Sequence, residues 1–132
     1  MATPNPVNWF EIPVTNMARA RTFYESAFEC QLSELPNAAI KMLAFPMEQG
    51  APGATGALIQ IEHCPPSMAG TTVYFHVACI DEAIKRITAA GGGIVMPRTS
   101  IGPYGFIAQF TDTEGNRVAL HQMPEAGDCQ GE

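Results

Sequence analysis

The sequence predicts one α+β domain that contains two copies of the same strand-helix-strand unit. A chain of 132 residues is long enough for one ordinary domain with its own hydrophobic core, and too short for two. When the sequence is shifted by 63 positions, apolar residues align first at every second position and then at helical spacing. The aligned pairs are Phe10 with Val73, Ile12 with Phe75, Val14 with Val77, Met17 with Ile80 and Ala20 with Ala83. This change of period at the same point of both copies indicates a strand followed by a helix.

The first copy begins with alternating apolar residues over 7–14, which predict a strand. Thr15 or Asn16 follows and can cap a helix, because either side-chain oxygen accepts a hydrogen bond from a free backbone N–H group. Two further strands are expected over 40–45 and 57–62, with a turn rich in Gly and Pro between them. The buried stripe of the helix is expected to comprise Met17, Ala20, Phe23, Tyr24, Ala27 and Phe28.

The second copy repeats this order after a linker at 65–70. A strand is expected over 72–77, and glycines at 91–93 end the following helix, since glycine adopts a left-handed C-cap at no steric cost. Strand patterns follow at 93–96, 106–111 and 117–122, and a turn at 113–116 joins the last two. The helix stripe is expected to comprise Ile80, Ala83, Ile84, Ile87 and Ala90.

Composition excludes several classes of function. The chain has 7 Lys and Arg against 13 Asp and Glu, a formal charge of −6, without the basic cluster that nucleic acids and anionic membranes require. Its apolar runs are far shorter than the roughly 20 residues of a transmembrane helix, and no signal-peptide pattern is present. We therefore expect a cytoplasmic protein with no nucleic-acid or membrane partner. Reduced thiols are expected at Cys30, Cys64, Cys79 and Cys129.

Three segments carry a resemblance to a known superfamily. They are residues 12–17 with Arg19, Ala20, Phe23 and Tyr24, residues 77–81 with Ala83, and the Asp-Thr-Glu-Gly-Asn turn at 112–116. In these segments the chain resembles the vicinal oxygen chelate (VOC) superfamily, which includes glyoxalase I, extradiol dioxygenases and bleomycin-resistance proteins. The resemblance implies a single VOC domain over 1–132. It implies two βαβββ modules, at 5–66 and 70–124, that form one open cup-like barrel around a pocket, and a flexible tail at 125–132.

The resemblance also implies where a metal would bind. Metal-dependent members of the superfamily place one ligand on the first strand and one on the last strand of each module. In this sequence those positions are Trp9, Gln60, Thr72 and Ala119. An indole, a hydroxyl and a methyl group cannot supply the three or four donors that a divalent cation needs. We therefore expect no metal cofactor at the usual site of the superfamily.

A second polar set is displaced along the same strands. Side chains two residues apart share a face of a strand, so the resemblance places Glu11, Glu62, Tyr74 and His121 in the cup, with His76 one step beyond Tyr74. We expect catalytic roles for Glu11, His76 and His121, because carboxylates and imidazoles act as acids and bases. The same three residues are the alternative ligands of a divalent ion such as Zn, Ni, Mn or Fe. Glu62 lies beside the linker, where a solvated strand end explains it more simply.

The substrate-binding groups are expected around this set. They are Trp9, Gln60, Thr72, Tyr74, Tyr104 and Phe106. Tyr104 and Phe106 belong to a glycine-containing loop at 101–106, which either lies over a pocket or forms a hairpin turn with Tyr104 packed on the sheet. An inward histidine such as His76 is also common as a hydrogen-bonded core residue.

These observations favour a glyoxalase-like protein that binds a small, partly aromatic molecule in the cup without a metal. The alternative is a metal-dependent lyase, isomerase or dioxygenase of the glyoxalase type that uses the displaced ligands. A third interpretation is an interaction module with a vestigial cup. Proteins of this fold commonly form dimers, so we also expect a homodimer.

Overall fold

A computed structural model describes residues 5–35 and 40–124. Within these ranges, two helices and eight strands occur in the order β-α-β-β-β, twice, which confirms the predicted fold class. The expected tail at 125–132 lies outside the described residues. The elements are β1 (Trp9–Pro13), α1 (Met17–Phe28), β2 (Ser33–Glu34), β3 (Lys41–Ala44), β4 (Thr55–Gln60), β5 (Tyr74–His76), α2 (Ile80–Ala89), β6 (Gly93–Ser100), the 3-10 turn η1 (Gly102–Tyr104), β7 (Phe106–Thr111) and β8 (Arg117–Gln122).

Each module forms its own four-stranded sheet. The first sheet has the order β1-β4-β3-β2 and the second the order β5-β8-β7-β6. In both, the first strand of the module pairs in parallel with the last, and the remaining pairs are antiparallel. Within the described residues the two sheets share no strand pairing, so they do not close into a barrel.

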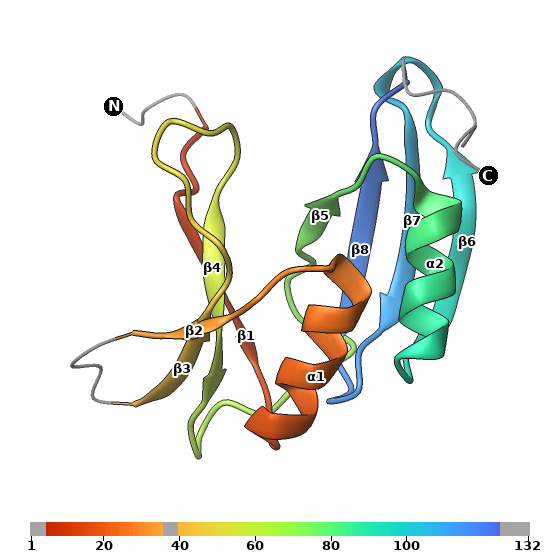
Figure 1. The fold of residues 1–132 in the computed structure, drawn as a ribbon. Coiled ribbons are helices and arrows are strands. Elements are labelled where there is room, and N and C mark those ends of the chain that lie inside the picture. Colours follow the sequence, from red (N-terminus) through yellow and green to blue (C-terminus); the bar gives the residue numbers. More distant parts are fainter. Residues whose placement is uncertain (1–4, 36–39, 125–132) are drawn as a thin grey trace.

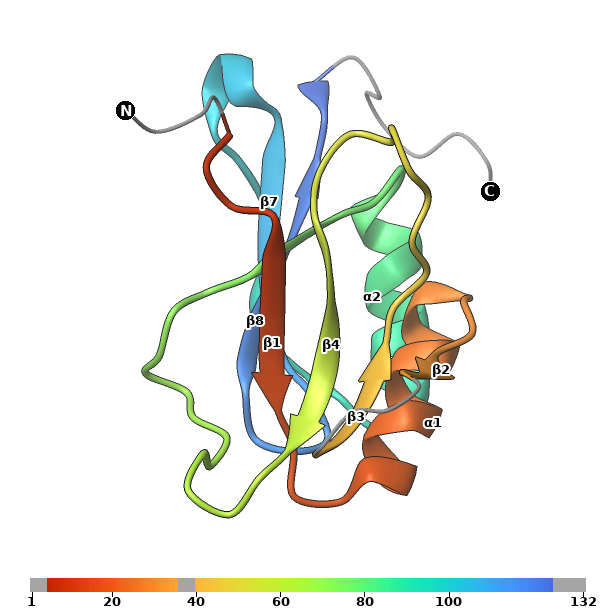
Figure 2. The same cartoon turned by 90° about the vertical axis from the view of Figure 1, so that its left-hand side faces the viewer.

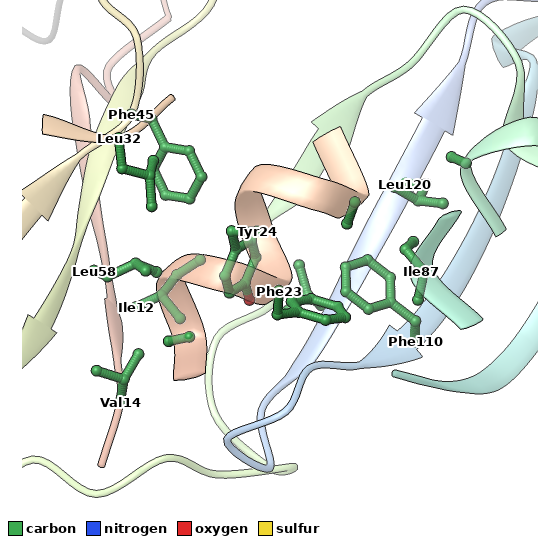
Figure 3. Packing of buried hydrophobic residues seen from close by; sticks show 14 of the residues in the cluster. Ile12, Val14, Phe23, Tyr24, Leu32, Phe45, Leu58, Ile87, Phe110 and Leu120 are labelled. Atoms are coloured by element: carbon green, nitrogen blue, oxygen red, sulfur yellow. The ribbon is translucent and has the colours of Figure 1, made fainter. Parts of the chain in front are cut away.

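The two sheets lie at an angle to each other, and both helices pack on the inner side of that angle (Figures 1 and 2). Figure 3 shows Phe23 and Tyr24 of α1 between Ile12 and Leu58 of the first sheet and Phe110 of the second. All five side chains are at most 3% exposed, and they belong to one hydrophobic cluster. Successive side chains of a strand point to opposite sides of its sheet. We call the side of each sheet that faces away from the helices its outer side.

Local signals explain where the helices begin and end. Asn16 caps α1, because its Oδ1 accepts the backbone N–H of Arg19 at 3.0 Å. The sequence had left Thr15 and Asn16 open as caps, and the structure selects Asn16. After α2, Gly91 has a φ of 107°, a left-handed conformation that glycine adopts without steric cost. The helix stop predicted at 91–93 is therefore confirmed.

Among the described cysteines one differs from the expectation, and Cys129 lies outside the described residues. Cys30 and Cys64 carry free thiols. Cys79, however, is disulfide-bonded, so the expectation of a reduced thiol is wrong there. Its Sγ also accepts the backbone N–H of Glu82 at 3.3 Å, at the N-terminus of α2.

No helix within the described ranges is long and apolar enough to cross a membrane.

Candidate functional site

The outer sides of the two sheets carry most of the predicted site residues. On β1, Trp9 and Glu11 alternate with Phe10 and Ile12, which pack in or against the core. Trp9 and Glu11 therefore lie on the outer side of the first sheet. On β5, Tyr74 and His76 flank Phe75, which packs against the core, so they lie on the outer side of the second sheet. Tyr74 is 48% exposed. The structure therefore divides the predicted set between two different sheets.

His76 and His121 are direct neighbours on the second sheet. The parallel strands β5 and β8 bring these two residues into register, as they do Tyr74 and Ala119. Adjacent strands lie ~4.8 Å apart, so the two imidazoles extend side by side from the same face. Nε2 of His121 lies 2.7 Å from the backbone oxygen of Tyr104. Because a carbonyl oxygen can only accept, Nε2 carries the proton of this hydrogen bond.

The loop at 101–105 ends beside this histidine pair. Tyr104 contacts His121 through its backbone oxygen, while the residue as a whole is 72% exposed. The ring is therefore not packed on the sheet, which was one of the two interpretations of this loop. Gly105 has a φ of 107°, and a Cβ added there would lie 2.2 Å from the backbone oxygen of Gln122. Glycine is thus required for the loop to approach the end of β8.

Glu11 lines a cleft where the two modules meet. The cleft has a volume of about 220 Å³ and lies between β1, the linker and β8. Figure 2 shows the linker, in green, passing beside β1 and β8. Arg117 at the start of β8 also lines the cleft, and sequence reasoning did not single it out. It precedes Ala119 and His121 at the spacing of two that places residues on one face, which is the signal that could have found it.

Two predicted substrate-binding residues lie on the helix side instead. Oε1 of Gln60 accepts the backbone N–H of Met17, the first residue of α1, at 3.2 Å. Phe106 packs against the core, and the guanidinium of Arg98 lies 4.9 Å from its ring centre. Packing against the helices determines which side each residue faces, and their role in substrate binding stays a prediction. Thr72 is half-buried in the segment that precedes β5.

Gln60 has a counterpart at the same place in the second module. Gln122 is the last residue of β8, and its Oε1 accepts the backbone N–H of Ile80, the first residue of α2, at 2.7 Å. The first N–H groups of a helix have no partner within the helix. Each module therefore ends its last strand with a glutamine that satisfies one of them.

The structure does not assemble the alternative metal site within one chain. Among the described residues, no group of three or more His, Cys, Asp or Glu side chains is placed to hold a metal ion. Glu11 lies on one sheet and the His76–His121 pair on the other, and two imidazoles are fewer than the three or four protein donors of zinc sites. The positions implied by the resemblance also do not fit a metal, since they hold Trp9, Gln60, Thr72 and Ala119.

The shortest ion pair among the described residues joins the two modules. Glu114 follows β7, and its side chain is fully buried. Its Oε1 accepts the backbone N–H groups of Thr15 and Asn16, each at 2.9 Å, and Arg19 Nε donates to Oε2 at 2.7 Å. Burial alone would raise the pKa of Glu114, but the hydrogen bonds from Arg19, Asn16 and Thr15 lower that pKa to about 2.

Asp112 and Asn116 of the same turn are also buried and bonded to the first module. The hydroxyl of Tyr24 donates to Asp112 Oδ2 at 2.6 Å, and Asn116 Nδ2 donates to the backbone oxygen of Pro13 at 2.8 Å. The pKa of Tyr24 is raised well above 10. Burial is the largest cause, and the charge of Asp112 is the next. The turn that carried part of the family resemblance thus joins the modules.

A larger cavity, of about 610 Å³, lies between the start of α1 and the β2–β3 region. None of the predicted site residues lines it.

Comparison with protein families agrees with this architecture. A model described as the Glyoxalase/Bleomycin resistance protein/Dioxygenase superfamily matches residues 7–120. A glyoxylase-like domain-containing protein from Didymella fabae is 30% identical over 128 residues, which cover 94% of this chain and 98% of that protein. The protein CFP32 of Mycobacterium tuberculosis is 27% identical over 129 residues, which cover 87% of this chain and 44% of that protein. The chain therefore spans less than half the length of this mycobacterial relative.

Solved structures share the fold at low sequence identity. The hypothetical protein SA1046 from S. aureus superposes with a TM-score of 0.69 at 17% identity, covering 92% of this chain and 95% of that one. TnmS3, an antibiotic binding protein from Streptomyces sp. CB03234, superposes with a TM-score of 0.64 at 23% identity. The match covers 93% of this chain and 98% of that one. Likeness at these identities shows a common fold alone.

Proposed function

Because this chain belongs to the Glyoxalase/Bleomycin resistance protein/Dioxygenase superfamily, we propose that it binds a small, partly aromatic molecule against the outer sides of its sheets, with no metal at the usual site of the superfamily. TnmS3, which has the same fold, binds an antibiotic, and this supports small-molecule binding as a function of such a scaffold. The proposal keeps Trp9 and Tyr74 as apolar contacts. Glu11, His76 and His121 are proposed to orient the polar groups of the ligand.

One observation carries the proposal, namely the contrast between two kinds of polar side chain. The buried ones, at Asp112, Glu114, Asn116 and Gln122, all hold turns and helix ends in place. Glu11, Tyr74 and His76 instead stand exposed within strands. Aromatic surface combined with a few polar groups is the usual composition of ligand sites.

We also propose that two copies of the chain complete this site. Glu11 lies on the outer side of the first sheet and the histidine pair on the outer side of the second, so the two groups do not face each other within one chain. In a two-fold symmetric pair, the first sheet of one copy can face the second sheet of its partner, and the same contact is made twice. A carboxylate opposite imidazoles is electrostatically favourable in such a contact.

The second candidate function is a metal-dependent lyase, isomerase or dioxygenase of the glyoxalase type. The side-by-side imidazoles of His76 and His121 favour it, since imidazole is a common ligand of transition metals. Elemental analysis of the purified homogeneous protein distinguishes the candidates. Stoichiometric Zn, Ni, Mn or Fe would overturn the metal-free proposal and support this one.

A thermal-shift screen of small aromatic compounds tests the proposed binding. We expect at least one compound to raise the melting temperature, because a ligand that binds the native state stabilises it. The shift should be lost in Tyr74→Ala and His121→Ala, and kept in the matched control His63→Ala, which alters an exposed histidine just before the linker. Loss of the shift in the control, or its retention in both site variants, would contradict the assignment.

Sedimentation measurements test the two-copy site. We expect a dimer, and we expect the compound found in the screen to strengthen it, because the ligand contacts both copies. A protein that stays monomeric with the compound bound would refute this part of the proposal.

A further inference from the structure

We propose that the cleft between β1, the linker and β8 is a separate binding site for a small zwitterion, whose carboxylate meets Arg117 and whose ammonium group meets Glu11. The inference goes beyond the proposed function and does not depend on it, because the cleft is complete within one chain. Glu11 is the one residue that the two sites share.

The size of the cleft limits the ligand. Its volume of about 220 Å³ is smaller than the roughly 300–1,000 Å³ of pockets for drug-sized molecules. A free amino acid or a molecule of similar size fits this space. Pro13, Pro65 and Val73 give the cleft apolar walls, which can contact a short aliphatic side chain, and Thr71 adds a hydroxyl.

The two charges of the cleft are not paired with each other. Glu11 and Arg117 both line it, yet neither forms an ion pair in the described part of the chain. The carboxylate of Glu11 accepts from Trp9 Nε1 at 3.3 Å. The Arg117 side chain donates through Nε to the backbone oxygen of Met68 at 3.0 Å, which anchors the guanidinium and leaves its two terminal nitrogens for a ligand.

This arrangement selects a ligand that carries both charges. A simple anion would be attracted by Arg117 and repelled by Glu11. A simple cation would be attracted by Glu11 and repelled by Arg117. A zwitterion satisfies both groups at once. The planar guanidinium matches a carboxylate with two parallel hydrogen bonds, whereas the Glu11 carboxylate accepts from an ammonium group.

Calorimetric titration of the full chain with L-valine tests the inference. N-acetyl-L-valine, which lacks the ammonium charge, and L-valinamide, which lacks the carboxylate, serve as matched probes. We expect L-valine to bind and each blocked probe to bind at least about tenfold more weakly, since each loses one charge-assisted interaction. No binding of L-valine up to about 10 mM, or equal binding of a blocked probe, would overturn the proposal.

Charge-removing variants locate the site. Arg117→Gln and Glu11→Gln should weaken L-valine binding at least about tenfold. Lys85→Gln and Glu48→Gln remove the same charges from other exposed positions and should leave the affinity unchanged. Arg117→Lys keeps the charge but not the planar fork, so an intermediate loss is expected even if Arg117→Gln fails to fold. Equal effects of the site and control variants would show a nonspecific charge effect and overturn the assignment.

The outer-face variants separate this inference from the proposed function. Tyr74→Ala and His121→Ala should abolish the thermal shift with the aromatic compound and leave L-valine binding intact, because neither residue lines the cleft. If these variants also abolish L-valine binding, the cleft is not a separate site.

Discussion

At the scale of single residues, Glu114 shows how one side chain can join two modules. It comes from the turn after β7, yet it accepts both backbone N–H groups at the entry to α1 and the guanidinium of Arg19, 95 residues earlier in the chain. A buried carboxylate is costly unless it is hydrogen-bonded and paired, and here both conditions hold. The sequence identified this turn as a family feature, but only the fold shows what the carboxylate contacts.

We expect Glu114→Gln to lower the free energy of unfolding by about 2 kcal/mol at pH 7, because the amide keeps the shape and loses the charge. Chemical denaturation measures this change. Glu34→Gln, at an exposed position, is the matched control and should change stability by less than about 0.5 kcal/mol. An equal effect of the two substitutions would contradict the assigned role of Glu114.

The same residue predicts how stability depends on pH. The folded-state pKa of about 2 lies below the ordinary value of 4.5, so the contribution of Glu114 is fully present above about pH 4.5 and is lost as the pH falls towards 2. Thermal unfolding between pH 5 and pH 2 should therefore show a steeper loss of stability in the wild type than in Glu114→Gln. Parallel pH profiles of the two proteins would show that another group dominates acid unfolding.

At the scale of elements, the two modules use the same device at the start of their helices. Gln60 and Gln122 end the last strands and accept the first backbone N–H groups of α1 and α2. The repeat in the sequence is carried by apolar positions and does not align these two glutamines with each other. Their shared role at the start of a helix is therefore visible only in the structure.

Replacement of these glutamines by leucine should have unequal effects. Gln122 is fully buried, so Gln122→Leu leaves the Ile80 N–H without a partner away from water, at a cost of about 1–3 kcal/mol. Gln60 is only partly buried, and water can replace its hydrogen bond in Gln60→Leu at a smaller cost. Denaturation midpoints of the two variants measure the difference, and a larger loss in Gln60→Leu would contradict this account.

At the scale of the whole molecule, one core serves both modules. Side chains from both sheets and both helices form a single buried cluster, and α1 of the first module lies between the two sheets (Figure 3). A unit of about 60 residues buries a small fraction of its surface on folding and is only marginally stable by itself. This is the physical reason why the two modules share one core. We therefore expect the two modules to unfold together.

Phe110→Ala tests this cooperativity, because it opens a cavity in the second module and should cost about 3–5 kcal/mol. The single tryptophan, Trp9, lies in the first module and reports on it by fluorescence. We expect fluorescence and far-UV circular dichroism to show one coincident transition, shifted by the same amount in the variant. A fluorescence transition that stays at the wild-type position would show that the modules unfold independently.

The sequence by itself determined the division into two similar modules, the stop of α2 and the order of helices and strands except the two-residue strand β2, because these depend on periodicity and on the conformational preferences of residues close together in the chain. The tertiary structure decided which side of each sheet faces the helices. It thereby separated Glu11 from the histidine pair, turned Gln60 and Phe106 inwards and brought Arg117 to the cleft. Alternation shows which side chains share a face, but the identity of that face depends on packing between residues that are distant in sequence.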